Sequence, residues 1–488
     1  MASKKTLNAR NLTSLGAERL AELLIETSMG DAAAKRLLRL ELAGVEGPAE
    51  VAREIRKRLT TISASRTYVD WDKIKVLASD LENQRRAIGD KVAPGEPVEA
   101  LDLMWRFLGL AGSVFDRCDD SSGKVGGVFR RACEDLSALA AAAEPSTTEL
   151  ADRTFSALCD NDYAQYDGLV RNLAPALGVE GLTLLRQRVT DLSGAPTYKP
   201  SKGERVIVGL GSNGPLYADQ IRGGSRTSMV RLALADIADA LGDVDAYIGQ
   251  HDERARSSPA IAARIAARLL AVGRAREALA AVELADSVPE GRLAGLIGRG
   301  ALSNDDLETA RVTALDVLGR GEEAQMARWA WFEQTLSARA LRDHLKRLPD
   351  FDDVEAEEKA MIMAVAYADP HRALSFLAAW PALAPAAELT IRRATEIDGD
   401  RYEILTPTAE ALSAKYPLAA TLLLRAMIDY TLERARSSRY RHAARHLQEC
   451  ESLAASVADF GGFSHHDDYV AGLRAAHGRK TGFWGLLG

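Results

Sequence analysis

Two histidines and a glutamate have the spacing that points most directly to chemistry. His442, His446 and Glu449 follow one another at intervals of four and three residues, which places all three on one face of a helix. Two imidazole rings and a carboxylate can hold zinc or iron and leave one coordination position open. Arg441 and Arg445 lie beside the histidines, so an ordinary polar helix face explains the same pattern. That second interpretation is the favoured one, and a metal-dependent enzyme is kept as a hypothesis.

Other catalytic motifs are missing from the sequence. It contains no GxSxG nucleophile turn, no GxxxxGK[ST] phosphate-binding loop and no HExxH motif. No residue is therefore predicted to be catalytic and no cofactor is expected. The sequence favours a protein that is not an enzyme.

A basic strip offers a second kind of site. Its residues lie on one predicted helix and are Arg339, Arg342, Lys346 and Arg347. Trp329, Trp331 and Phe332 precede them, and cations together with aromatic rings can bind the phosphates and stacked bases of a nucleic acid. The acidic stretch DFDDVEAEEK follows directly and can neutralise the strip. A solvated helix face is therefore favoured over a nucleic-acid site.

Three glycines match a dinucleotide-binding pattern. Gly209, Gly211 and Gly214 form GxGxxG after the strand-like run RVIV, and such glycines let a backbone approach a pyrophosphate. The required context does not follow, because Pro215 comes next and residues 228–241 have a helical pattern rather than that of a second strand. We expect a loop here and no cofactor.

The composition predicts that these residues lie on helices. The chain has 488 residues, of which 47% are hydrophobic and only 6% aromatic, so Ala, Leu, Val and Ile must build the core, as in closely packed helices. A net charge of −7 argues against a general attraction to nucleic acid. The four cysteines form no CxxC pair, no secretory signal is present and no apolar run is long enough to span a membrane. We therefore expect a cytoplasmic protein without a membrane partner.

Residues 259–290 have the clearest repeat pattern. They predict two short antiparallel helices joined by a turn at Gly273. The facing positions are small or apolar, namely Ile265, Ala266, Leu269, Ala278, Val282 and Ala285. This arrangement is typical of a tetratricopeptide-like helical hairpin.

The region from residue 417 to residue 454 predicts a second helical pair. On the first helix Ala420, Leu423, Leu424, Met427 and Ile428 recur with helical spacing and indicate a core face. Arg425, Asp429 and Arg436 are expected on the opposite side. Cys450, on the second helix, is expected to be a packed thiol.

Composition along the chain predicts three segments. Residues 1–192 form an N-terminal helical lobe, 193–227 are an irregular loop or linker rich in Pro and Gly, and 228–488 are a C-terminal tetratricopeptide-like lobe. The predicted fold is all-α, an α-α superhelix of tetratricopeptide or HEAT-like hairpins with one irregular region.

Two long blocks of the sequence carry a family resemblance. They are ARWAWFEQTLSARALRDHLKRLPDFDDVEAEEKA and PLAATLLLRAMIDYTLERARSSRYRHAARHL. They resemble an uncharacterised bacterial family of unknown function that is similar to proteins with a SWIM-type zinc finger. The resemblance implies a helical, tetratricopeptide-like protein and supplies no catalytic residues. The CxC and CxH pairs of the finger itself are absent.

These observations favour a non-enzymatic cytoplasmic helical-repeat scaffold that binds a protein or peptide partner, because stacked hairpins expose many helix faces at fixed spacing. The first alternative is a nucleic-acid-associated helical-repeat protein that uses the basic strip. The second alternative is a metal-dependent enzyme that uses His442, His446 and Glu449.

Overall fold

The structure is a computed structural model that falls into two compact units. The residues that it describes are 7–195, 207–211, 214–286 and 305–487. Unit 1 comprises Met1–Glu253 and unit 2 comprises Arg254–Gly488. The chain thus divides after Glu253, whereas the sequence placed its linker at 193–227. Unit 1 continues past that segment because the helix that follows it packs on the helix that precedes it.

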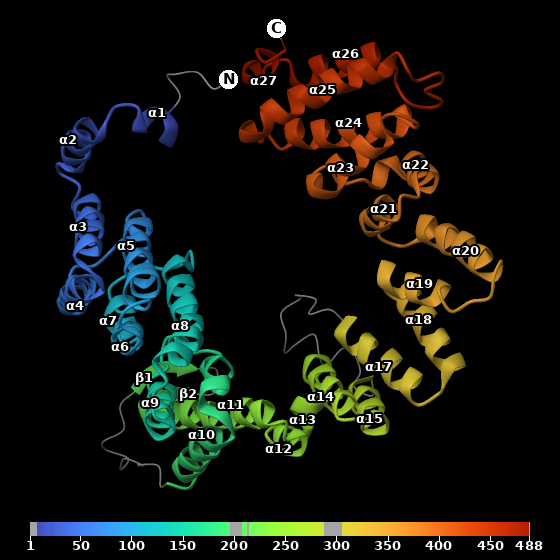
Figure 1. Cartoon of the computed structure of the whole chain (residues 1–488). Coiled ribbons are helices and arrows are strands. Elements are labelled where there is room, and N and C mark those ends of the chain that lie inside the picture. The colour runs from blue at the N-terminus through green and yellow to red at the C-terminus, as the bar shows by residue number, and fades with distance from the viewer. Residues whose placement is uncertain (1–6, 196–206, 212–213, 287–304, 488) are drawn as a thin grey trace. The chain divides into compact units, whose positions relative to one another are not determined.

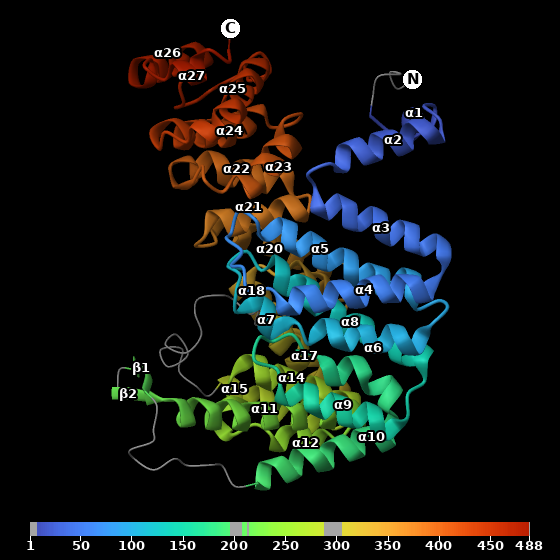
Figure 2. The same cartoon turned by 90° about the vertical axis from the view of Figure 1, so that its left-hand side faces the viewer.

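Unit 1 is built from helices in sequence-adjacent pairs. Its elements, in chain order, are α1 (Ala9–Thr13), α2 (Ala17–Ser28), α3 (Ala32–Glu46), α4 (Pro48–Ala64), α5 (Ile74–Ala87), the π-helical turn η1 (Ile88–Val92), α6 (Pro97–Leu108), α7 (Ala111–Phe115), α8 (Lys124–Ala143), α9 (Thr147–Cys159), α10 (Leu169–Gly194), β1 (Ile207–Gly211), β2 (Gly214–Tyr217), α11 (Ala218–Leu241) and α12 (Val244–Gly249). Figure 2 shows α3, α4 and α6 one below another. The contacts of α4 with both neighbours confirm this order.

Unit 2 continues the same construction after α13 (Glu253–Arg256), a short helix at the boundary. Its further elements are α14 (Pro259–Ala271), α15 (Ala275–Asp286), α17 (Asp305–Val317), α18 (Gly321–Thr335), α19 (Ala338–Leu345), α20 (Asp352–Ala366), α21 (Pro370–Ala379), α22 (Leu383–Arg392), the 3₁₀ turn η2 (Ala394–Glu396), α23 (Tyr402–Leu412), α24 (Pro417–Glu433), the 3₁₀ turn η3 (Ser437–Arg439), α25 (Tyr440–Ala454), α26 (His466–His477) and α27 (Thr481–Trp484). The all-α class predicted from the sequence is confirmed.

The irregular segment predicted at 193–227 contains regular structure. Strands β1 and β2 pair antiparallel, with Gly211 opposite Gly214, so the GxGxxG residues lie in a two-stranded ribbon rather than between a strand and a helix. Within this motif Ser212 and Asn213 lie outside the described residues. Helix α11 begins at residue 218, ten residues before the predicted start. The glycines at 223 and 224 lower intrinsic helix propensity, which is why the sequence concealed this start.

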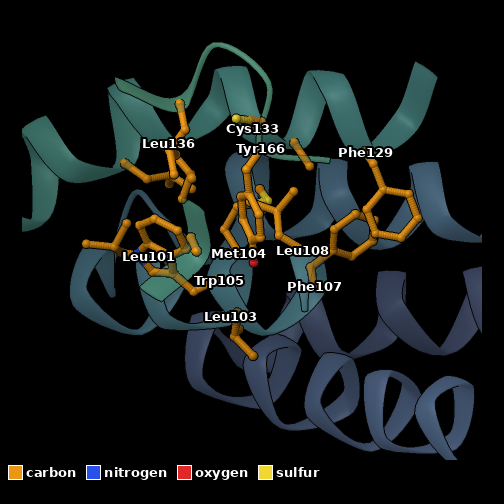
Figure 3. Close-up of a cluster of buried hydrophobic side chains, with 14 of the residues drawn as sticks. Leu101, Leu103, Met104, Trp105, Phe107, Leu108, Phe129, Cys133, Leu136 and Tyr166 are labelled. Atoms are coloured by element: carbon orange, nitrogen blue, oxygen red, sulfur yellow. The ribbon is translucent and has the colours of Figure 1, made fainter. Parts of the chain in front are cut away.

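The core of unit 1 extends from α3 to α11. Figure 3 shows the part of it that α6 and α8 form with Tyr166, which precedes α10. Phe107 of α6 and Phe129 of α8 are both buried, and their ring centroids lie 5.4 Å apart. Trp105, also on α6, packs against Tyr166, and the centroids of these two rings lie 6.2 Å apart. Aromatic pairs at these separations add packing energy to the area that they bury.

The hairpin predicted at residues 259–290 is confirmed over its described part as α14 and α15, which pack on each other (Figure 1). Gly273 has a φ of 77° and begins the turn. The backbone N–H of Arg274 donates to the carbonyl of Leu269, and that of Gly273 to the carbonyl of Leu270. A glycine in the left-handed region is the usual residue for ending a helix in this way. All six facing positions named from the sequence are buried.

The core of unit 2 gathers around α24, which packs on α22, α23 and α25 (Figure 1). The five apolar residues predicted for the core face of α24 are buried, and so is Cys450 of α25. The interpretation of Cys450 as a packed thiol is thereby confirmed. Among the described residues, no helix has the length and apolar character needed to cross a bilayer.

Candidate functional site

The three candidate metal ligands lie on α25 in different environments. His446 is buried with 5% of its surface exposed, whereas His442 and Glu449 face solvent. Glu449 pairs with Arg445 at 3.6 Å. No group of three or more His, Cys, Asp or Glu side chains within the described part of the chain is arranged to hold a metal ion. The helical spacing is thus present, but the structure does not bring the three side chains together as a ligand set.

Two of these residues instead line a pocket, called here the α23–α25 pocket. Its volume is about 370 Å³. Helix α23 contributes Ala409 and Glu410, α24 contributes Leu424, and α25 contributes Arg445, His446, Glu449 and Leu453. The pocket forms because α23 and α25 both pack on α24, which leaves a cleft between their outer faces.

His446 is the most unusual residue of this pocket. Burial lowers the pKa of His446 to about 4, and the charges of Arg445 and His442 add to the effect. The imidazole is therefore neutral at neutral pH. Its Nδ1 atom is buried and has no hydrogen-bond partner in the described structure. Unpaired polar atoms are costly in a protein interior, so this buried nitrogen distinguishes His446 from the exposed His442 on the same helix.

A polar cluster within the core of unit 2 includes Arg425, which the sequence analysis placed wrongly, and the half-buried Asp429. Arg425 and Asp429 of α24 were expected on a solvent face, yet Arg425 is only 6% exposed. Its Nη1 donates to the carbonyl of Ser464 at 2.8 Å, and its Cζ lies 4.3 Å from the ring centre of Tyr469. Burial also raises the pKa of Asp429. The available signal was that α24 is apolar nearly all round, because such a helix is buried on every side and carries its polar residues inside.

The basic strip occupies α19 and the residue positions after it. Arg339, Arg342 and Lys346 are exposed and recur with helical spacing on one face. Arg339 lies 4.0 Å from Asp343, and Arg342 lies over the ring of Trp380 at 4.9 Å. Arg347 points elsewhere, since its Nη2 lies 3.5 Å from Asp316 of α17.

The aromatic residues before the strip do not accompany it on the surface. Trp331 and Phe332 are buried in the core of unit 2. The indole N–H of Trp331 donates to Asp305. Trp329 is partly buried and lies against His344, with 5.2 Å between ring centres. Their packing supports the interpretation of the tryptophans as interhelix core residues.

A larger concavity lies between α20 and α22 and is called here the α20–α22 groove. The sequence analysis did not predict it. It has a volume of about 590 Å³. Its lining includes Met361, Ile362 and Val365 of α20, and Pro385, Glu388 and Arg392 of α22. Ile362 is 70% exposed. Arg392 donates to Glu388 at 2.8 Å, so the groove has an apolar wall and an ion pair on its opposite side.

Comparison with protein families gives one result of broad coverage. The profile of a family described as "Family of unknown function (DUF6880)" matches residues 2–486. The chain therefore belongs to this family, as the resemblance to an uncharacterised family led us to expect. The comparison with curated proteins gave no match.

Proposed function

We propose that this member of the DUF6880 family is a non-enzymatic helical-repeat scaffold that binds a protein or peptide partner. Its paired helices are proposed to continue within each unit as an α-α superhelix of tetratricopeptide or HEAT-like hairpins. Such pairs expose helix faces at regular spacing and leave concave surfaces between helices that are not adjacent in the chain. The observation that carries the proposal is the α20–α22 groove.

The chemistry of this groove supports a peptide-like partner. Ile362 leaves 70% of its surface in water, and it shares the wall with Met361 and Val365. Covering such a wall with the apolar side chains of a partner removes that surface from water, worth roughly 25 cal/mol for each Å². The Arg392–Glu388 pair on the opposite wall supplies polar groups that orient a peptide backbone or an end charge.

An affinity experiment with matched variants tests this proposal. The native cell extract is divided into two halves, and one half is treated with nuclease. Each half is incubated with tagged full-length protein as the wild type, as Ile362→Asp and as Val354→Asp. Val354 is 54% exposed on the same helix but does not line the groove. A protein partner captured by the wild type and by Val354→Asp, and lost with Ile362→Asp in both halves, supports the proposal. Equal capture by the two variants overturns the assignment to this groove.

A nucleic acid is the alternative partner, favoured by one observation. Arg339 and Arg342 of α19 and Lys346, which directly follows this helix, are all exposed. The double variant Arg342→Glu, Lys346→Glu should then weaken binding to a random-sequence oligonucleotide, and wild-type affinity should fall steeply with salt. The control is Arg53→Glu, Lys57→Glu, which changes the same number of charges on exposed residues of α4. Affinity that does not depend on salt excludes this alternative.

A further inference from the structure

We propose that the α23–α25 pocket receives a basic side chain, lysine or arginine, of a partner peptide. The inference rests on the proposed function in one respect, namely that the ligand is part of a peptide. It assigns a chemical class of ligand to a second concavity of unit 2, separate in its lining residues from the α20–α22 groove.

The charge of the lining favours a cation. Glu410 enters from α23, and Glu449 and Arg445 enter from α25. Arg445 is paired with Glu449 at 3.6 Å, whereas Glu410 is exposed and has no ion-pair partner among the residues that the structure describes. Two carboxylates and one guanidinium leave a net charge of −1, with the imidazole of His446 neutral. An anionic ligand would meet the unpaired carboxylate, while a cation would neutralise it.

His446 provides an independent reason for a hydrogen-bond donor in the pocket. Its ring is 5% exposed, and its Nδ1 has no hydrogen-bond partner among the residues that the structure describes. A neutral imidazole has one nitrogen that accepts a hydrogen bond, and an ammonium or guanidinium group carries only donors. Because His446 and Glu410 both line the pocket, we propose that a bound basic side chain pairs with Glu410 and donates to the His446 ring once the lining around Nδ1 opens.

The remaining lining suits the aliphatic part of such a side chain. Ala409, Leu424 and Leu453 form the apolar surface of the pocket. Lysine and arginine place their methylene stems along apolar surface while the charged end reaches polar groups. The pocket volume of about 370 Å³ lies within the range in which concave ligand sites occur.

Imidazole signals in NMR spectra of the full-length protein test this inference. The chain has eight histidines, and labelling them with ¹³C and ¹⁵N gives few signals, of which His446 is identified by its loss in His446→Gln. The probes are three acetylated and amidated pentapeptides, each with a central lysine, arginine or norleucine between alanines. We expect a saturable shift of the His446 signal with a basic peptide, with a Kd of about 1 mM, and none with norleucine.

A matched pair of variants separates the pocket from a general charge effect. Glu410→Gln should raise the Kd for the basic peptide about tenfold, which corresponds to a loss of about 1.4 kcal/mol in binding free energy. Glu403→Gln makes the same change at an exposed position of α23 outside the pocket and should leave affinity unchanged. Equal loss in both variants, a His446 shift with norleucine, or no shift with either basic peptide overturns the inference. If Ile362→Asp captures the partner as well as Val354→Asp does, and the His446 signal still shifts with the basic peptides, the groove assignment is rejected and the pocket assignment is retained.

Discussion

The phenolic O–H of Tyr469 in α26 donates a 2.7 Å hydrogen bond to the carboxylate of Asp429 in α24. Arg425, one turn earlier on α24, lies against the face of the Tyr469 ring. Burial raises the pKa of Tyr469 as well as that of Asp429. A carboxylate that is partly removed from water needs hydrogen bonds to offset its lost hydration. The bond from Tyr469 therefore stabilises the packing of α26 against α24.

Removing the Tyr469 hydroxyl should therefore destabilise the protein. We expect Tyr469→Phe to lower the free energy of unfolding by about 1–2 kcal/mol, because it leaves the half-buried carboxylate of Asp429 without this donor. Urea denaturation gives this value. Tyr402→Phe is the control, since Tyr402 is 45% exposed, and it should be nearly neutral. In the Asp429→Asn background the cost of Tyr469→Phe should shrink; an equal cost in both backgrounds would contradict the pairing.

His446 should make stability sensitive to acid. Its folded pKa of about 4 lies below the usual value of 6.5, so the unfolded chain takes up a proton in this window that the folded chain does not. Stability contributed by the neutral ring is present above pH 6.5 and is lost as the pH falls toward 4. The loss approaches about 3 kcal/mol, at about 1.4 kcal/mol for each pH unit.

The variant His446→Gln removes this acid-linked loss. Its free energy of unfolding should fall less steeply than that of the wild type between about pH 6.5 and pH 4, measured by urea denaturation at several pH values. Near pH 8 the ring is neutral in both states, so the difference there reports packing alone. Parallel curves over the acid window would show that the ring is not held neutral by the fold.

Gly399 marks a close approach of the chain to α24. A Cβ at this position would lie 2.6 Å from the carbonyl carbon of Ala426 and 2.7 Å from the Cβ of Tyr430. Helix backbone cannot move aside cheaply, so Gly399→Ala should cost about 1–3 kcal/mol or more. Gly472→Ala is the control, because its Cβ would meet nothing within 4 Å inside α26. That change should stabilise the protein by about 0.5–1 kcal/mol, and thermal denaturation compares the two.

The cysteines should differ in reactivity in the order of their exposure. Cys450 is fully buried, and burial raises the pKa of its thiol to about 12. Burial raises the pKa of Cys133 to about 11, whereas Cys159 is exposed. Because the thiolate is the reactive form, iodoacetamide should modify Cys159 first and Cys450 only after unfolding. Mass spectrometry of digested protein follows each site, and all four should react in urea. Early modification of Cys450 in native protein would be inconsistent with this core.

The sequence by itself determined the helices and many of their buried faces. An α-helix completes a turn about every 3.6 residues, so apolar residues that recur with this period mark the side that packs. The α14–α15 hairpin was therefore readable from its alanines and from Gly273. The burial of Cys450 was readable in the same way. Membership of an uncharacterised family was visible in two long blocks of sequence.

Only the tertiary structure decided what the candidate residues meet. Glu410, His446 and Glu449 line one pocket because α23 and α25 both pack on α24. His442, on the same helix, remains exposed and outside it. Arg425 became a buried residue because α24 is covered on several sides. Periodicity describes one helix at a time, but burial and the neighbours of a side chain depend on contacts between helices distant in sequence. Those contacts arise from packing that no single segment encodes.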